Sequence, residues 1–262
     1  MSLNNLFSLK GRTALVTGGS RGIGKIIAKA FIEQGAKVYI SSRKAAACEE
    51  TAAELGPNCI PLPMDVSTVD GCRALAKALA EREDHLDVLV NNAGAAWGVP
   101  FEEFPEAGWD KVMDLNVKSP FFLTQSLHEL LKVKASHDAP SKVINITSID
   151  GLRLNPWDTY SYHASKAALI YLTKRMAARL IKDGIIVTSL APGAFASEMN
   201  RAARDHGDTV AKGIPMRRIG NFDDMAGAAI FLASRASDYV VGDTLVVDGG
   251  LVNASLGTSI DA

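Results

Sequence analysis

A tyrosine and a lysine stand four residues apart near the middle of the chain, at Tyr162 and Lys166. Residues with this spacing on a helix share a face, so the lysine ammonium can lie beside the tyrosine hydroxyl. A nearby cation favours the ionised phenol and lowers its pKa from the ordinary value of about 10. Such a phenol is able to donate or accept a proton near neutral pH. The same pair is also common on one turn of any surface helix, so its interpretation depends on the rest of the chain.

Two neighbours of this pair bear on the same chemistry. Ser148 ends an apolar run upstream of Tyr162 and carries a hydroxyl. Tyr160 is the rival phenol, but Ala164 occupies the position four residues after it. Tyr162 is therefore the better candidate for an acid/base group.

A glycine-rich segment, Thr17–Gly24, follows the first β-rich run and opens a helical pattern. Gly18, Gly22 and Gly24 allow a tight turn and a close backbone approach, and a helix N-terminus presents unpaired N–H groups to a pyrophosphate. The spacing is Gly-x-x-x-Gly-x-Gly and differs from the commoner Gly-x-Gly-x-x-Gly fingerprint. Its place in a strand–loop–helix unit predicts a dinucleotide site.

The end of the second predicted strand indicates which dinucleotide is bound. An acidic residue that would bind the ribose 2′-hydroxyl of NAD is absent there, and the chain reads Ser41, Ser42 and Arg43. Arg43 and Arg21 are placed where a 2′-phosphate would lie, and guanidinium groups suit phosphate by charge and geometry. We predict a preference for NADP(H), although both arginines are also compatible with solvated surface positions.

Two later strands are followed by residues that are suited to a cofactor site. Asp65 and Val66 follow the third predicted strand, and Asn91–Gly94 follow the fourth. Open α/β sheets bind ligands at the carboxyl ends of their strands. Asp65 is placed to accept a hydrogen bond from an adenine amino group or to favour the start of the next helix, and the two roles are compatible. The Ala93-Gly94 step allows close approach of a cofactor.

Strand-like and helix-like runs alternate along the chain. This alternation predicts an α/β protein: a single-domain Rossmann fold over residues 1–262, with a doubly wound, seven-stranded parallel sheet and helices on both faces. Residues 194–215 are polar and poorly patterned, and we expect them to form a substrate lid within this domain. Strands are predicted at 13–17, 37–41, 58–62, 86–90, 142–147, 185–190 and 244–248, and helices from Ile23 towards Gly35 and at 44–55, 67–83, 105–133, 160–182 and 222–234.

Composition narrows the class of protein. The chain has 262 residues, a net charge of −1 and no long basic run, so neither nucleic acid nor a membrane surface is an expected partner. Three cysteines without a Cys-x-x-Cys spacing favour free thiols in a reducing compartment, and no signal peptide or membrane span is evident, so we expect a cytoplasmic protein. The five histidines lack the spacing of a zinc site. Trp97 and Trp157 flank the predicted site in sequence and are candidates for its wall or for packing.

Taken together, these segments resemble the short-chain dehydrogenase/reductase family over about residues 7–250. Within the family, the chain is similar to 3-oxoacyl-acyl carrier protein reductases, including the branch associated with rhamnolipid synthesis. The order and spacing of the shared segments make the resemblance specific. They are Thr17–Gly24, Asp65, Asn91–Gly94, Asn116, Ser148, Tyr162, Lys166, Pro192-Gly193, Gly242 and Asp248–Gly250.

The resemblance implies a role for each matching residue. Tyr162 is implied as the acid/base, Lys166 as the group that lowers its pKa and holds the nicotinamide ribose, and Ser148 as the group that orients the substrate oxygen. Asn116 is implied to support a water-linked proton path to Lys166. Ser197 keeps a hydroxyl where the family often has threonine. The implied cofactor contacts are Gly18, Ser20, Arg21, Gly22, Ile23, Gly24, Arg43, Asp65, Val66, Asn92, Ala93, Gly94, Tyr162, Lys166, Pro192, Gly193 and Ser197.

The catalytic residues leave the substrate open. The resemblance favours NADPH-dependent reduction of a 3-oxoacyl group carried by acyl carrier protein or coenzyme A, or of another small carbonyl compound. A sugar-acid or polyol dehydrogenase, such as a gluconate 5-dehydrogenase-like enzyme, shares the same scaffold, and a catalytically silent dinucleotide-binding protein is a further alternative. The resemblance also implies a homotetramer or homodimer, formed through the helices at 105–133 and 160–182 and the C-terminal strand region.

Overall fold

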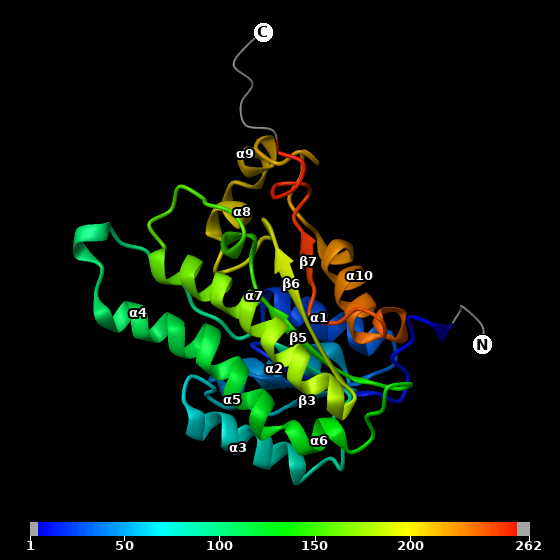
Figure 1. Cartoon of the computed structure of the whole chain (residues 1–262). Coiled ribbons are helices and arrows are strands. Elements are labelled where there is room, and N and C mark those ends of the chain that lie inside the picture. The colour runs from blue at the N-terminus through cyan, green and yellow to red at the C-terminus, as the bar shows by residue number, and fades with distance from the viewer. Residues whose placement is uncertain (1–4, 256–262) are drawn as a thin grey trace.

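Seven strands pair in parallel, in the order β3-β2-β1-β4-β5-β6-β7, in a computed structural model that describes residues 5–255 (Figure 1). Each predicted strand is present, and its ends differ from the prediction by no more than two residues. The strands are β1 (Thr13–Thr17), β2 (Lys37–Ser41), β3 (Cys59–Pro61), β4 (Val88–Asn91), β5 (Ser141–Ile146), β6 (Ile185–Pro192) and β7 (Thr244–Val247).

The central strands are buried on both faces, which explains their continuous apolar composition. In β1, Leu15 contributes to the apolar core on one face of the sheet, and its neighbour Val16 contributes to the core on the other face. The first face is covered by α3 (Val69–Ala80), α5 (Ser119–Ser126), α6 (His128–Lys132) and α7 (Tyr160–Leu180). The second face is covered by α1 (Gly22–Glu33), α2 (Ala45–Leu55) and α10 (Phe222–Ala233). The prediction of a doubly wound sheet is confirmed.

The order of strands reverses between β1 and β4, because the chain runs outward from β1 to β3 and then returns to the other side of β1. At such a switch point the loops that follow the two neighbouring strands turn in opposite directions and leave a crevice. The glycine-rich loop follows β1, and Asn92–Gly94 follow β4. The fold therefore brings these two segments together at the carboxyl edge of the sheet.

The prediction of one continuous helix at 105–133 is wrong, because the structure divides this range into several helical segments. The structure has α4 (Glu106–Met113), a π-helical segment at Asp114–Lys118, then α5 and α6. The π turn contains Asn116, which is only 1% exposed and bonds to groups outside its own helix. Such bulges insert a residue to aim a side chain and are frequent at functional sites. The helix is thus interrupted at the place where the buried side-chain amide of Asn116 contacts other segments of the chain.

The segment expected as an irregular lid also contains regular structure. Two short helices, α8 (Arg201–Asp205) and α9 (Gly207–Lys212), lie within residues 194–215. Asn200 caps α8, with its side-chain oxygen accepting the Ala203 amide at 3.0 Å. Both helices lie above the sheet near the carboxyl end of β6 (Figure 1). Within residues 5–255, no helix combines the length and apolar character that a membrane crossing requires.

Candidate active site

A cavity of about 960 Å³ lies at the carboxyl edge of the sheet and extends from the glycine-rich loop to the N-terminal part of α7. Every residue that the sequence suggested for cofactor binding lines this cavity, and so do Ser148, Tyr162 and Lys166. Asn116 is the exception among the suggested site residues, since it is buried behind the cavity wall. Residues separated by more than a hundred positions in the chain therefore share one surface.

The glycine-rich loop has no room for larger side chains. A Cβ atom on Gly24 would lie 2.3 Å from the carbonyl oxygen of Gly18, and Gly18 itself has a φ of +64°. The loop is fixed to β4 because Asn92 Nδ2 donates to the carbonyl oxygens of Thr17 and Gly18 at 2.9 and 3.2 Å. No side chain caps the N-terminus of α1. Its N–H groups are therefore available to a phosphate, as predicted from the sequence.

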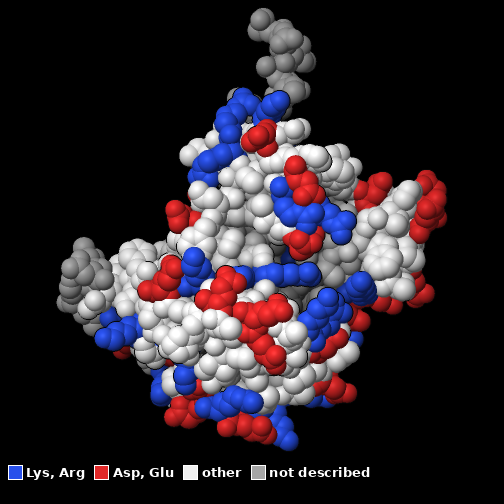
Figure 2. Space-filling model, turned by 180° about the vertical axis from the view of Figure 1, so that it is seen from behind, with Lys and Arg blue, Asp and Glu red and all other residues white. Residues whose placement is uncertain are grey.

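The far end of the cavity is suited to a second phosphate. Arg21 and Arg43 are exposed and line the cavity, and among the described residues neither makes an ion pair or a side-chain hydrogen bond. Ser41 Oγ is buried there without a hydrogen-bond partner. Figure 2 shows basic side chains beside a hollow in this side of the molecule. The two guanidinium groups form a donor set that fits a 2′-phosphate.

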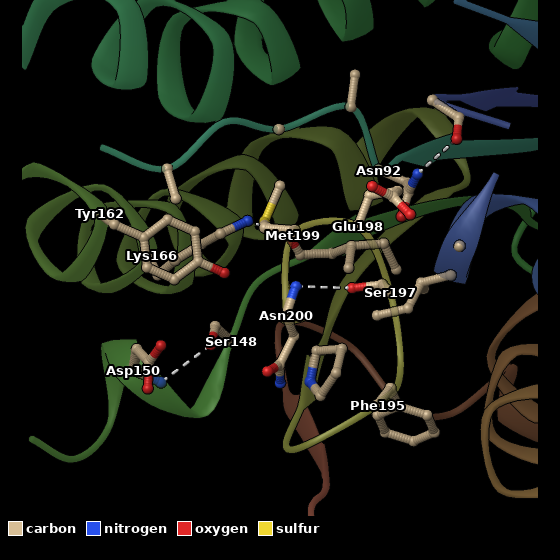
Figure 3. Close-up of a pocket in the computed structure, with 18 of the residues that line it drawn as sticks. Asn92, Ser148, Asp150, Tyr162, Lys166, Phe195, Ser197, Glu198, Met199 and Asn200 are labelled. Carbon is tan, nitrogen blue, oxygen red and sulfur yellow. Dashed lines mark hydrogen bonds between the residues drawn. The ribbon is translucent and has the colours of Figure 1, made fainter. Parts of the chain in front are cut away.

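Tyr162 and Lys166 lie together in the cavity, as their spacing on α7 predicts (Figure 3). Lys166 Nζ is 5.4 Å from the centroid of the Tyr162 ring and donates to the carbonyl oxygen of Ile146 at 2.9 Å. Ser148 lines the same wall from the end of β5 and caps the short 3₁₀ helix Ile149–Gly151. A phenol, a hydroxyl and an ammonium therefore converge where a substrate oxygen could be bound.

The expectation that the pKa of Tyr162 is lowered is wrong for the protein by itself, without a bound ligand. Burial raises the pKa of Tyr162 to about 12, although the neighbouring Ser148 hydroxyl acts in the opposite direction. Burial also lowers the pKa of Lys166 to about 8. Both changes have one cause, because a buried site disfavours whichever form carries charge. The spacing of the two residues indicates only the attraction between an ammonium and a phenolate. It does not report the free-energy cost of burying a charged group.

Tyr160, the rival phenol, faces away from the cavity. Its hydroxyl donates to Asp158 Oδ1 at 2.7 Å, and its ring contacts Phe101 and Phe104 edge-on. It is absent from the residues that line the cavity. The preference for Tyr162 over Tyr160 thus agrees with the structure.

Asn116 joins three segments behind the cavity. Its Oδ1 accepts the Ala95 amide at 2.8 Å, while its Nδ2 donates to the Ala95 carbonyl at 2.9 Å and to Ser165 Oγ at 3.0 Å. These bonds hold the loop after β4 against α7, close to Lys166. The water-linked path to Lys166 stays a prediction.

Several residues of the wall were missed by sequence reasoning. Trp157 lines the cavity, but Trp97 does not, because it packs against Gly108 with Lys111 Nζ 5.1 Å from its ring centroid. Asp150 was also missed. It lies two residues after Ser148, just beyond the end of β5, and this position is the one local feature of the sequence that could have suggested it as a site residue. Met64 and Thr147, which adjoin Asp65 and Ser148, and Leu251, which only the fold brings to the cavity, were also missed, whereas Phe195, Met199 and Val210 belong to the predicted lid.

The chain belongs to the short-chain dehydrogenase/reductase family, a class of oxidoreductases. A family model described as enoyl-(acyl carrier protein) reductase matches residues 18–252. The chain is 45% identical, over 93% of its length and 97% of the relative, to the rhamnolipids biosynthesis 3-oxoacyl-[acyl-carrier-protein] reductase of Pseudomonas aeruginosa. It is 36% identical, over 96% of its length and 98% of the relative, to gluconate 5-dehydrogenase of Gluconobacter oxydans.

Solved structures show the same two kinds of relative. The active-site complex of Pseudomonas aeruginosa RhlG with NADP superimposes with a TM-score of 0.91 at 45% identity, covering 94% of this chain and 98% of the other. A gluconate 5-dehydrogenase from Burkholderia cenocepacia, in complex with NADP and tartrate, gives a TM-score of 0.86 at 36% identity, covering 96% and 99%. The fold and family predicted from the sequence are confirmed.

Proposed function

We propose that this protein is an NADPH-dependent reductase that converts the ketone of a 3-oxoacyl thioester, or of a related neutral 3-oxo compound, into a secondary alcohol. The observation that carries the proposal is the convergence of Ser148, Tyr162 and Lys166 on one wall of the cavity that begins at the glycine-rich loop. The relative with 45% identity, a 3-oxoacyl-[acyl-carrier-protein] reductase, supports the same class of substrate.

NADP(H) is the cofactor that the cavity fits. The N-terminus of α1 and the tight backbone of Gly18–Gly24 would hold the pyrophosphate, and Arg21 and Arg43 would hold the 2′-phosphate. Asp65 and Val66 would hold the adenine, while Pro192, Gly193 and Ser197 would hold the nicotinamide. When bound, the reduced nicotinamide supplies the hydride for the ketone carbon.

The chain's own residues manage the negative charge and the proton. As the carbonyl gains negative charge, the hydroxyls of Ser148 and Tyr162 donate hydrogen bonds to its oxygen. Tyr162 then transfers its proton, and the ammonium of Lys166 stabilises the phenolate that forms. The raised pKa of Tyr162, about 12, keeps the phenol protonated at neutral pH, which is the form that reduction requires. Asn116 positions the loop after β4 against Lys166.

Apolar side chains favour an acyl substrate over a sugar. Val99, Met199, Val210 and Leu251 line the cavity, and all but Val99 belong to the segments around the proposed lid at 194–215 or to the C-terminal segment. Burying the methylene groups of an acyl chain against such a wall is favourable, because it removes apolar surface from water. Burying sugar hydroxyls there is unfavourable, because they would lose hydrogen bonds to water. Arg201 and polar side chains such as Asn155 and Asn200 also line the cavity, and they favour a sugar acid, the second candidate.

Comparing a neutral 3-oxoester with a keto sugar acid tests the choice of substrate class. We expect kcat/KM for ethyl 3-oxohexanoate to exceed that for 5-ketogluconate at least roughly tenfold, because the ester buries several methylene groups. NADPH oxidation followed by absorbance measures both reactions. Faster turnover of the sugar acid would favour the second candidate, and tight NADPH binding without turnover of any carbonyl would favour a silent binding protein.

We also propose that the protein is cytoplasmic and forms a homodimer or homotetramer. Cys48, Cys59 and Cys72 are all buried and free, which supports a reducing compartment. Large apolar side chains are exposed on α4, α5 and α7, at Trp109, Phe121 and Tyr171. An apolar surface on neighbouring helices is typical of a self-association face. Light scattering at micromolar concentration should give a mass of two or four chains, and a monomer would contradict the assembly.

A further inference from the structure

One carboxylate in the cavity has no partner. Asp150 lies in the 3₁₀ helix Ile149–Gly151, and its backbone N–H donates to Ser148 Oγ at 3.1 Å. The residue is half-buried and lines the cavity, and its carboxylate makes no hydrogen bond or ion pair with any residue in the described part of the chain. Figure 3 shows Asp150 beside Ser148, on the same side of the pocket as the ring of Tyr162.

The negative charge of Asp150 influences the pKa values of Tyr162 and Lys166. Its carboxylate raises the pKa of Tyr162 and also raises the pKa of Lys166, opposing part of the effect of burial on the lysine. Arg153, a cation three residues further along the chain, donates to the carbonyl oxygens of Leu251 and Leu154, and Lys166 is the cation on which the charge of Asp150 acts. Asp150 therefore presents a negative charge close to the place where Ser148 and Tyr162 meet a substrate oxygen.

Other charged groups line the same cavity from different elements. Asp158 accepts the Tyr160 hydroxyl at 2.7 Å at the start of α7. From the lid, Glu198 pairs with Arg204, and Arg201 also lines the cavity. None of these groups, unlike Asp150, is a cause of the pKa shifts of Tyr162 and Lys166.

We propose that Asp150 is a specificity-determining residue, whose carboxylate excludes ketones with a carboxylate close to the reacting carbonyl and admits the matching neutral esters and thioesters. The inference rests on the proposed function and extends it to the charge of the substrate. Two like charges repel each other, so a site gains selectivity from a repulsive group as well as from attractive ones.

A matched pair of substrates measures this selectivity. Ethyl 3-oxohexanoate and 3-oxohexanoate share the same ketone, and the acid carries a negative charge where the ester is neutral. We expect the isosteric Asp150→Asn variant to raise the ratio of kcat/KM for the acid to kcat/KM for the ester about tenfold, with each value taken at its optimal pH. Asp150→Glu keeps the charge and should keep the preference of the wild-type protein for the ester.

The pH dependence gives a second readout, which a purely structural role would not move. Loss of the negative charge lowers the pKa of both Tyr162 and Lys166, because Asp150 raises both. Reduction requires both the Lys166 ammonium and protonated Tyr162, and Lys166 has the lower pKa, so the alkaline fall in kcat/KM for the ester should begin at lower pH in Asp150→Asn than in the wild type or in Asp150→Glu.

The outcomes separate the two proposals. Absence of ester reduction by the wild-type protein would overturn the proposed function. With ester reduction intact, an unchanged ester-to-acid ratio and an unchanged pH profile in Asp150→Asn would overturn the role of Asp150 alone. If Asp150→Asn does not fold, Asp150→Ser removes the same charge and is expected to give the same shift in the ratio.

Discussion

Replacing Tyr162 by phenylalanine is expected to lower kcat for a neutral 3-oxoester by about a thousandfold, because the phenyl ring has no proton to transfer. The affinity for NADPH should stay within about twofold of the wild-type value, since the ring that packs beside Lys166 is retained. NADPH oxidation measures the rate, and fluorescence of the bound cofactor measures its dissociation constant. A loss confined to kcat would place Tyr162 in the chemical step.

Tyr160→Phe is the matched control for this substitution. It removes the same hydroxyl two residues away, but that hydroxyl bonds to Asp158 and lies outside the cavity. We expect the variant to retain most of its activity. If Tyr160→Phe were inactive while Tyr162→Phe reduced the ester at a near-normal rate, the two phenols would have to exchange roles.

Arg43→Ala is expected to raise KM for NADPH roughly fiftyfold and to leave KM for NADH nearly unchanged. A charge-assisted hydrogen bond contributes about 1.5–3 kcal/mol, and about 1.4 kcal/mol corresponds to a tenfold change in affinity. NADH has no 2′-phosphate and therefore cannot gain from this guanidinium. Initial rates with each cofactor, at a saturating concentration of ester, measure both constants.

Lys44→Ala is a suitable control for the cofactor experiment. Lys44 is an exposed cation next to Arg43 in sequence, but it does not line the cavity. Its replacement tests whether general positive charge near β2 attracts NADPH. Equal effects of the two substitutions on NADPH, or equal use of NADPH and NADH by the wild-type protein, would contradict a specific 2′-phosphate site formed by Arg43.

Local patterns were enough to predict the framework of the site. A continuous apolar run such as Thr13–Thr17 marks a strand that is buried on both faces, and the glycines after it mark a tight turn. Because parallel strands end at one edge of the sheet, the predicted topology was also enough to place Gly18, Asn92, Ser148 and Pro192 around one cavity. The spacing of Tyr162 and Lys166 determined their shared face directly.

The remaining features depend on tertiary contacts and on solvent. The break at Asp114–Lys118 accompanies the bonds of Asn116 to Ala95 and Ser165, and neither partner could be known from the helical pattern. The raised pKa of Tyr162 follows from burial, which the Tyr-Lys spacing does not report. Asp150 was missed because an acidic residue after a strand is common, and its importance depends on the absence of a neutralising partner.

The central claim is that Tyr162, Ser148 and Lys166 direct hydride from NADPH to a ketone carbon. The most direct measurement uses NADPH deuterated at the transferable position of its nicotinamide, with ethyl 3-oxohexanoate as substrate and mass spectrometry of the product. We expect ethyl 3-hydroxyhexanoate with one deuterium on the carbon that bears the hydroxyl. Failure to form this alcohol, or reduction only of the unsaturated ester ethyl 2-hexenoate, would contradict it.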